Sequence, residues 1–380
     1  MILIRLRAGA QFRRGSCSCT CMSTRTTARA VPTVAVLLCT WRAGDSLDRQ
    51  LDSIAVQDWP VTLFVQDDAS GDDTALRARA HPAVTHVRVN SNNLGFVENF
   101  GTAIDLALAH SFDYIALADQ DDVWHSDRVS SGMHQLLQAE ADLGTEHPIL
   151  AHSDLQVIDG NDTLLKSSFL RYRGYSTGDR RHLPTMLGQC GVLGNTVLMN
   201  RSMAELSRPF PAGLHSHDWW LGLVAELFGT RCFIDKATVD YRLHDSNTSN
   251  TLDSLAGRRL TSLRRGIAGG LVKRDLRLPF HEDSRSSSLK TLLTENSRWP
   301  SISPSDRNVI ETFISYLDLK EPRGKLLLLI FRGGYLKPTL LHRARVAFAL
   351  LFTQRYESRV DELGSSDTRE GSSHDIKESV

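Results

Sequence analysis

The chain has 380 residues, of which 41% are hydrophobic and 23% are charged. This composition is typical of a globular protein and excludes a collagen-like or wholly disordered chain. The 44 basic residues balance the 44 acidic ones, which disfavours a general nucleic-acid binder, because such proteins carry an excess of Lys and Arg. Its six cysteines follow neither a disulfide framework nor a zinc ribbon, so we expect a reducing compartment such as the cytoplasm.

The first 30 residues differ from the rest of the chain. They contain six arginines and no acid, and they lack the apolar core of a signal peptide. Three cysteines stand two apart at Cys17, Cys19 and Cys21, a spacing that does not suit one tetrahedral metal ion. We expect residues 1–30 to be a disordered tail or an over-long start.

Strand and helix patterns alternate from residue 34 to residue 117. Val34–Leu38 is a continuous apolar run, which is typical of a strand buried on both faces of a parallel sheet. Asp45 or Ser46 can cap the helix that follows. The expected elements are strand 34–38, helix 47–54, strand 61–65, helix 74–80, strand 86–89, helix 96–108 and strand 114–117. We predict an α/β fold with a mostly parallel sheet flanked by helices, whose ligand site lies beyond the carboxyl ends of the strands.

Two acidic clusters follow strands of this predicted sheet. Residues 66–74 read QDDASGDDT, and residues 118–124 read ADQDDVW. Mg²⁺ and Mn²⁺ prefer oxygen ligands, so an Asp-x-Asp after a strand suits a metal ion bound to a nucleotide diphosphate. A helix cap and a solvated turn are the alternative, above all for the first cluster. The chain has no P-loop motif, and no glycine-rich dinucleotide fingerprint follows its first strand.

These motifs resemble the inverting glycosyltransferases of family 2, which have the GT-A fold. The resemblance covers about residues 33–250 and rests on four segments: 34–57, 67–74, 93–99 and the DQDDVW motif at 119–124, in the form seen in rhamnosyltransferase-like members. It implies that Thr40, Asp67, Asp68 and Asn93 bind the nucleotide. It also implies that Asp119 and Asp121, the ends of the DXD motif, engage the ribose and a divalent metal, Mg²⁺ or Mn²⁺. The chain has Thr40-Trp41-Arg42-Ala43-Gly44 where the family usually has Thr-Tyr-Asn-Gly.

The second half of this region contains a candidate general base. Ala151–Ile158 and Val192–Met199 are expected strands, and 169–188 an irregular excursion between them. Asp218, in the sequence His217-Asp218-Trp219-Trp220, begins an apolar helical pattern. From the residues alone it is either a helix cap or a base for proton abstraction. The resemblance implies the base.

Four further residues are candidate binding groups. Trp219 and Trp220 are either core residues or platforms for a sugar, with Trp219 assigned to the nucleotide-sugar site. Arg242 either neutralises a phosphate or pairs with Asp240. The resemblance places His244 beside the diphosphate as a metal ligand.

Beyond residue 250 the composition becomes basic and apolar. Residues 258–277 carry seven basic side chains against one acid, and a second basic and apolar patch covers 325–352. We expect helices at 251–356 that either cover the catalytic domain of residues 31–250 or contact a membrane surface, followed by a disordered tail at 357–380. The apolar runs fall short of the about 20 residues that a membrane span needs.

Together these features predict an inverting, metal-assisted glycosyltransferase. The resemblance favours transfer of L-rhamnose from dTDP-rhamnose to a glycan or lipid-linked glycan during synthesis of a cell-envelope polysaccharide. The enzyme would be cytoplasmic or peripheral on the inner face of the cell membrane. The alternatives are a nucleotidyltransferase or nucleotide-sugar hydrolase on a similar sheet, and a nucleotide-sugar-binding protein without turnover.

Overall fold

The fold was analysed in a computed structural model. It describes residues 31–175, 178, 181–243, 285–295, 297–318, 325 and 335. The chain divides into two compact units, Met1–Val31 and Pro32–Val380, and the fold below is that of the second. The predictions for residues 1–30, for the basic segment 258–277, for 357–380 and, apart from two residues, for the patch at 325–352 lie outside the described residues.

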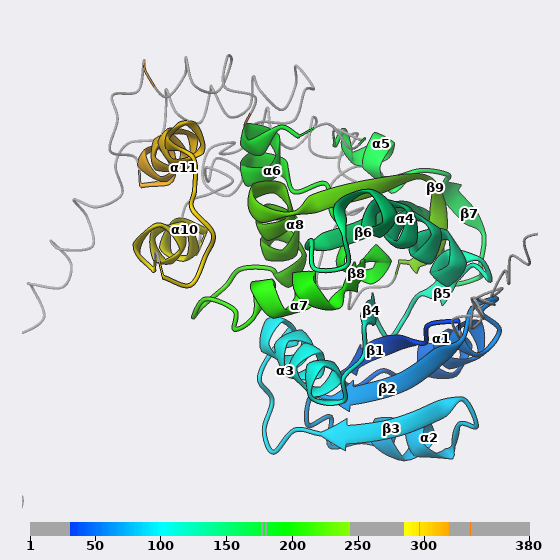
Figure 1. Ribbon diagram of the computed structural model, residues 1–380. Helices are drawn as coiled ribbons and strands as arrows, with labels where there is room; N and C mark the ends of the chain where they lie inside the picture. The colour runs from blue at the N-terminus through cyan, green and yellow to red at the C-terminus, as the bar shows by residue number, and fades with distance from the viewer. Residues whose placement is uncertain are drawn as a thin grey trace, which may run out of the picture. The chain divides into compact units, whose positions relative to one another are not determined.

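One mixed sheet of nine strands organises the described part of the second unit (Figure 1). The strand order is β3-β2-β1-β4-β8-β6-β9-β5, and β7 pairs with β6. The strands are β1 (Val34–Thr40), β2 (Val61–Asp67), β3 (Val84–Val89), β4 (Tyr114–Ala118), β5 (Val123–Trp124), β6 (Ile149–Ile158), β7 (Leu164–Lys166), β8 (Leu198–Asn200) and β9 (Thr230–Arg242). Strands β1 to β4 are parallel, whereas β8 runs antiparallel to both β4 and β6.

Strand β1 is fully buried because helices cover both faces of the sheet. Val34, Val36 and Leu38 pack in one apolar cluster, and Ala35 and Leu37 pack in the other. The first cluster includes side chains of α1 (Ser46–Ala55), α2 (Thr74–Ala80) and α4 (Arg128–Leu143). The second includes side chains of α3 (Phe96–Ala109), α6 (Leu183–Gln189), α7 (Arg201–Ser207), α8 (His217–Phe228), α10 (Arg285–Thr294) and α11 (Pro304–Leu317). This two-sided burial explains the continuous apolar run that the sequence shows.

The register of the parallel strands brings the acidic loops to one edge. Thr40 pairs with Asp67 across β1 and β2, and Leu38 pairs with Ala118 across β1 and β4. The loops that leave these three strands therefore start side by side. This edge, beyond the carboxyl ends of the strands, is the one expected to hold a ligand.

The structure differs from the predicted elements in several places. The stretch 169–188 contains two short helices, α5 (Phe169–Arg173) and α6, where we expected irregular chain. The strand expected at 192–199 is a 3₁₀ turn, Gly194–Thr196, followed by the short β8, because Val197 N–H bonds back to the Gly194 carbonyl. Asp45 precedes α1 without a capping side-chain hydrogen bond. Helix α4, which covers the sheet after the acidic motif, was not predicted.

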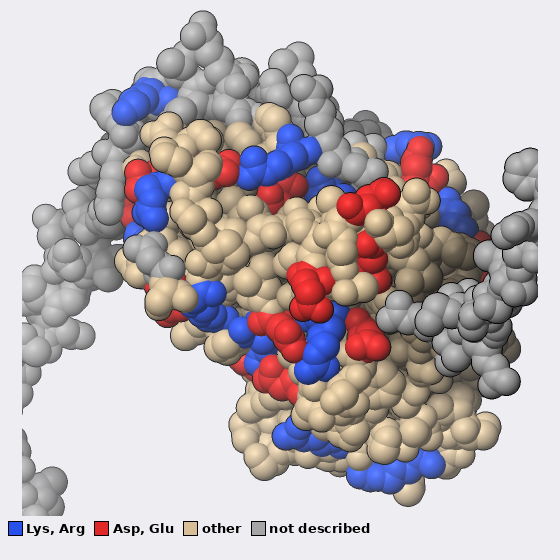
Figure 2. Space-filling view, viewed as in Figure 1, with Lys and Arg blue, Asp and Glu red and all other residues tan. Residues whose placement is uncertain are grey.

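The surface carries mixed charge. In Figure 2, acidic and basic side chains lie next to one another across the middle of this face, as the balanced composition leads one to expect. Within the residues that the structure describes, no helix is both long and apolar enough to cross a membrane.

Candidate active site

The ends of β1 and β2 are joined through Asp67. The Thr40 hydroxyl donates to Asp67 Oδ1 at 2.9 Å, and the Ser70 backbone N–H donates to Oδ2 at 3.0 Å. Thr40 and Asp67 are both buried, at 2% and 1% exposure. The Asp67 carboxylate therefore fixes the loop after β2 against the end of β1, and it is already hydrogen-bonded before any ligand arrives.

Asp68 holds the next loop in the same way. Its carboxylate accepts hydrogen bonds from the Asn90 side chain and from the backbone N–H groups of Leu94 and Gly95, each at 2.8 Å. The Asn93 amide donates to the Asp68 carbonyl at 3.2 Å. Of the four residues assigned to the nucleotide, Asn93 is the exposed one, and Asp68 shapes the loop that presents it.

The DQDDVW motif places three carboxylates close together after β4. Burial, together with the negative charges of Asp121 and Asp218, raises the pKa of Asp119 to about 7. Burial also raises the pKa of Asp122 well above its usual range, again with Asp121 and Asp119 adding to the effect. Burial, with contributions from Asp119 and Asp68, raises the pKa of Cys39 at the end of β1. The two acidic clusters thus act on the same region.

A buried arginine lies beneath this acidic motif. Arg128, at the start of α4, is 3% exposed, and its Nη2 donates to the carbonyls of Leu117, Asn195 and Val197 at 2.8 to 3.2 Å. Its guanidinium lies 3.5 Å from the centre of the Trp124 ring. Burial lowers the pKa of Arg128, while Asp122 and Asp119 oppose that effect. An arginine side chain remains protonated in proteins, so Arg128 supplies a fixed positive charge to the cluster.

Asp218 reaches the same cluster from the other half of the sheet. It lies in the first turn of α8 rather than at the cap position, which is Ser216. Its Oδ1 accepts from the Ser216 hydroxyl and, at 2.6 Å, from the Trp219 backbone N–H. The charge of Asp218 contributes to the raised pKa of Asp119. Residues almost 100 positions apart therefore share one electrostatic environment.

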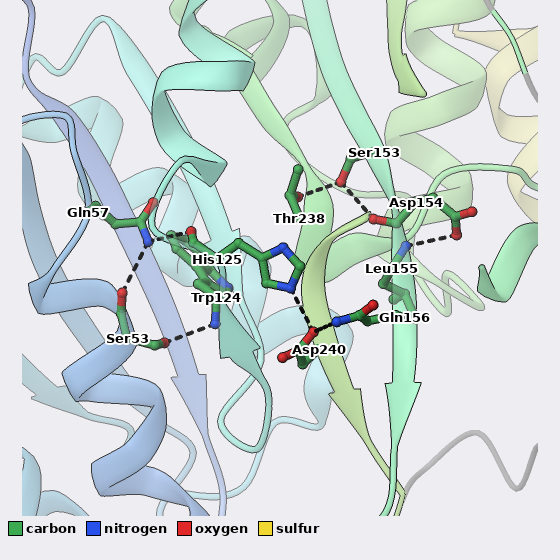
Figure 3. A network of polar contacts seen from close by, with 10 residues as sticks. All are labelled: Ser53, Gln57, Trp124, His125, Ser153, Asp154, Leu155, Gln156, Thr238 and Asp240. Carbon is green, nitrogen blue, oxygen red and sulfur yellow. Dashed lines mark hydrogen bonds and ion pairs between the residues drawn. The ribbon is translucent and has the colours of Figure 1, made fainter. Parts of the chain in front are cut away.

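A polar network secures the segment that follows the motif (Figure 3). His125 Nε2 lies 2.7 Å from Asp240 Oδ1, and the Gln156 amide donates to the same oxygen at 2.6 Å. The Gln57 amide donates to the His125 carbonyl at 2.9 Å, and Trp124 N–H donates to the Ser53 hydroxyl at 3.0 Å. Hydrogen bonding to Asp240 raises the pKa of His125. The network ties β5 to α1, β6 and β9 and so fixes the end of the acidic motif.

Two of the predicted contacts need correction. Trp219 is 2% exposed, and its indole N–H donates to the Leu187 carbonyl at 3.2 Å. A fully packed indole offers no ring face to a sugar, so Trp219 anchors α8 in the core. Arg242 pairs with Asp162 at 2.6 Å and donates to the Asp159 carbonyl, whereas Asp240 pairs with His125. The Asp240 pair, one of the two alternatives for Arg242, is thus not formed among the described residues, while the phosphate role of Arg242 stays a prediction.

The chemistry of the site suits a divalent cation bound together with a substrate. Among the described residues, no three His, Cys, Asp or Glu side chains are close enough to hold a metal ion by themselves. His244, the predicted third ligand, lies outside those residues. Mg²⁺ is commonly bound through one or two carboxylates and the phosphates of its substrate. Asp119 and Asp121 fit that pattern, because their mutual repulsion raises the pKa of Asp119 and a cation would relieve it.

Two residues of the site were not predicted from the sequence. Arg128 follows the motif by a few positions, so a basic residue at the start of the next helix was the available signal. Asn195 donates from Nδ2 to Asp122 at 2.5 Å, and it is 4% exposed. The sequence gives no signal for Asn195, because its partner is 73 positions away and only the fold brings the two together.

Comparison with known proteins gives a family for part of the chain. Residues 35–144 match the sequence model of the family described as Glycosyl transferase family 2. The chain therefore carries a glycosyl transferase family 2 domain, and the match extends from β1 through α4.

One curated relative is the dTDP-rhamnosyl transferase RfbG of Shigella flexneri. It is 23% identical over 208 residues, which make up 53% of this chain and 69% of that protein. Among solved structures, S. aureus TarS in complex with UDP-GlcNAc has 14% identity and a TM-score of 0.47, with 83% of this chain and 79% of that chain covered. The mannosyltransferase PcManGT from Pyrobaculum calidifontis, in complex with GDP-Man and Mn²⁺, has 16% identity and a TM-score of 0.43, with 88% and 79% covered.

Proposed function

We propose that this glycosyltransferase moves a sugar from a nucleotide diphosphate donor to a glycan or lipid-linked glycan acceptor with inversion at the anomeric carbon. The observation that carries the proposal is the convergence of Asp119 and Asp121 with Asp218 in one electrostatic environment. In this proposal Asp119 and Asp121 act on the nucleotide diphosphate donor, and Asp218 acts on the acceptor hydroxyl. The similarity to a dTDP-rhamnosyl transferase favours dTDP-L-rhamnose as donor, at low identity.

Asp218 is the proposed general base. A carboxylate in reach of the acceptor hydroxyl takes its proton as the oxygen attacks the anomeric carbon. The new C–O bond forms on the face opposite the diphosphate, the bond to the diphosphate breaks, and the configuration inverts. The hydrogen bonds from Ser216 and from the Trp219 backbone hold the carboxylate at the start of α8. Its placement there would leave Oδ2 for the acceptor.

On the donor side, Asp121 and Asp119, with His244, would hold Mg²⁺ or Mn²⁺. When bound, such an ion offsets the negative charge of the departing diphosphate. Thr40, Asp67, Asp68 and Asn93 would position the nucleotide. Because the first three are buried and bond to one another or to the chain, their proposed role is to fix the loops whose backbone and exposed side chains contact the base and ribose.

The proposed domain plan keeps the catalytic domain at 31–250 and a covering region at 251–356. A lipid-linked acceptor would make a basic surface useful, because anionic headgroups attract Lys and Arg. Peripheral contact with the inner face of the cell membrane thus remains part of the proposal, and it depends on basic segments outside the described residues.

The function can be tested by following both products. Purified protein is incubated with dTDP-rhamnose, UDP-GlcNAc or GDP-mannose, Mn²⁺ and a panel of glycan and lipid-linked glycan acceptors. Release of nucleoside diphosphate that depends on the acceptor, with a glycosylated product, supports the proposal. Asp218→Asn should keep donor binding and lose most turnover, by about 100-fold or more. Asp142→Asn, an exposed change on α4, serves as the matched control.

Other outcomes distinguish the alternatives. Pyrophosphate release from a nucleoside triphosphate and a sugar 1-phosphate would indicate a nucleotidyltransferase. Donor binding without turnover under all conditions would indicate a nucleotide-sugar-binding protein. Normal transfer by Asp218→Asn would remove Asp218 from the role of base.

A further inference from the structure

The 3₁₀ turn Gly194–Thr196 contacts both halves of the site. On the donor side, the Asn195 amide donates to Asp122, and the Asn195 carbonyl accepts from Arg128 at 2.8 Å. On the acceptor side, Gly194 lies against the first turn of α8, where His217 and Asp218 begin the helix. The turn is therefore the direct link between the acidic motif and the proposed base.

Gly194 leaves no room for a side chain at this link. A Cβ built on Gly194 would lie 2.6 Å from His217 Nε2, closer than real contacts allow. It would also lie 3.3 Å from His217 Cε1, which is a tight contact, and 3.5 Å from Asp218 Cβ. The backbone of Gly194 is not in the left-handed region. Glycine is thus required here by the close approach of α8 rather than by backbone conformation.

His217 forms the other side of this contact. Its ring is 6% exposed and stacks on Phe100 with a centroid separation of 4.1 Å. Neither ring nitrogen has a hydrogen-bond partner among the described residues. Burying an imidazole without a partner is unfavourable, and an apolar side chain would stack on Phe100 at less cost. Among the described residues, the ring therefore acts through its packing against Phe100 and Gly194 and not through a hydrogen bond.

We propose that Gly194 and His217 are positioning residues: their close contact sets the place of Asp218 relative to the acidic motif. This inference rests on the proposed function, since it assigns a base to Asp218. The imidazole, clamped between Phe100 and Gly194, fixes the first turn of α8 from one side. The hydrogen bonds of Asn195 with Asp122 and Arg128 fix the 3₁₀ turn itself.

The contact predicts a specific pattern of rescue. Gly194→Ala pushes the start of α8 away and should lower kcat by about tenfold or more, because small displacements of a catalytic group are costly. Binding of the donor nucleotide, which this side of the site does not hold, should change less than about twofold. His217→Asn ends the side chain before Nε2 and Cε1, the two atoms that the new methyl group would meet. The double variant should therefore recover to within about threefold of His217→Asn alone.

The experiment measures kcat, acceptor KM, nucleotide affinity and the free energy of unfolding for the wild type, both single variants and the double variant. Gly160→Ala, where a Cβ meets nothing within 4 Å, controls for the exchange itself. If Gly194→Ala does not fold, His217→Asn still tests the inference. Loss of the His217 ring from between Phe100 and Gly194 should by itself lower kcat without lowering nucleotide affinity.

The outcomes separate this inference from the proposed function. Absence of transfer by the wild type would refute both. Transfer by the wild type with an unchanged kcat in either single variant would overturn the inference alone. So would a double variant whose kcat falls below that of His217→Asn by the same factor as Gly194→Ala lowers the wild type, because the loss would then not act through His217.

Discussion

Removal of the buried charge of Arg128 should strongly destabilise the protein. In Arg128→Met, three carbonyls lose hydrogen bonds worth about 1 kcal/mol each, and Trp124 loses a desolvated cation–π contact of about 2 kcal/mol. Asp122, which is fully buried, loses its nearby positive charge as well. We therefore expect the free energy of unfolding at pH 7 to fall by about 5 kcal/mol, the sum of the lost hydrogen bonds and the lost cation–π contact.

Urea unfolding measures this loss directly, and a second substitution shows its cause. Asp122→Asn removes the carboxylate that Arg128 offsets while keeping an acceptor for Asn195. The variant with both changes should thus be less destabilised than the two single effects together imply. Arg49→Met removes an exposed ion pair with Asp162 and should change stability by about 0.5 kcal/mol or less. A loss of about 1 kcal/mol or less in Arg128→Met would refute the reasoning.

Two further predictions concern pH. Because the folded pKa of Asp119 is raised to about 7, stability should be lost as pH rises from about 4 to 7. Asp119→Asn should remove that loss and raise the free energy of unfolding at pH 8, measured by urea unfolding, by about 1–2 kcal/mol. An unchanged free energy of unfolding would contradict the raised pKa. Hydrogen bonding to Asp240 raises the pKa of His125, so the stability from this pair is present below about pH 6.5 and is lost as pH rises through the folded value. Asp240→Asn should cost about 1 kcal/mol at pH 6 and much less at pH 9; equal losses at both values would show that the histidine charge is not involved.

The sequence predicted the first half of the fold, from β1 to β4, well because the signals of these elements are local. Helix 74–80 coincides with α2, and strand 34–38 falls within β1. In this half, a strand buried on both faces produces an apolar run and a surface helix produces a four-residue period. The acidic clusters follow β2 and β4, and parallel strands end at the same edge of a sheet. Their convergence could therefore be expected from topology alone.

The second half of the fold, after β4, was harder to predict because its structure depends on distant contacts. Residues 192–199 are apolar enough for a strand, but Gly194 and Asn195 turn there to reach α8 and Asp122. Trp219 resembles a sugar platform in sequence, and only the packing of α8 shows that it is buried. The partner of Arg242 likewise comes from a turn 80 positions earlier, which no local pattern indicates.

The most direct test of the central claim is the dependence of nucleotide affinity on metal and on Asp121. The affinity of dTDP is measured by calorimetry with and without Mn²⁺, for the wild type, for Asp121→Ala and for the control Asp142→Asn. We predict that Mn²⁺ strengthens binding by about tenfold or more in the wild type and the control, and hardly at all in Asp121→Ala. Equal affinities with and without Mn²⁺, and in all three proteins, would contradict a site in which these acids act on a diphosphate.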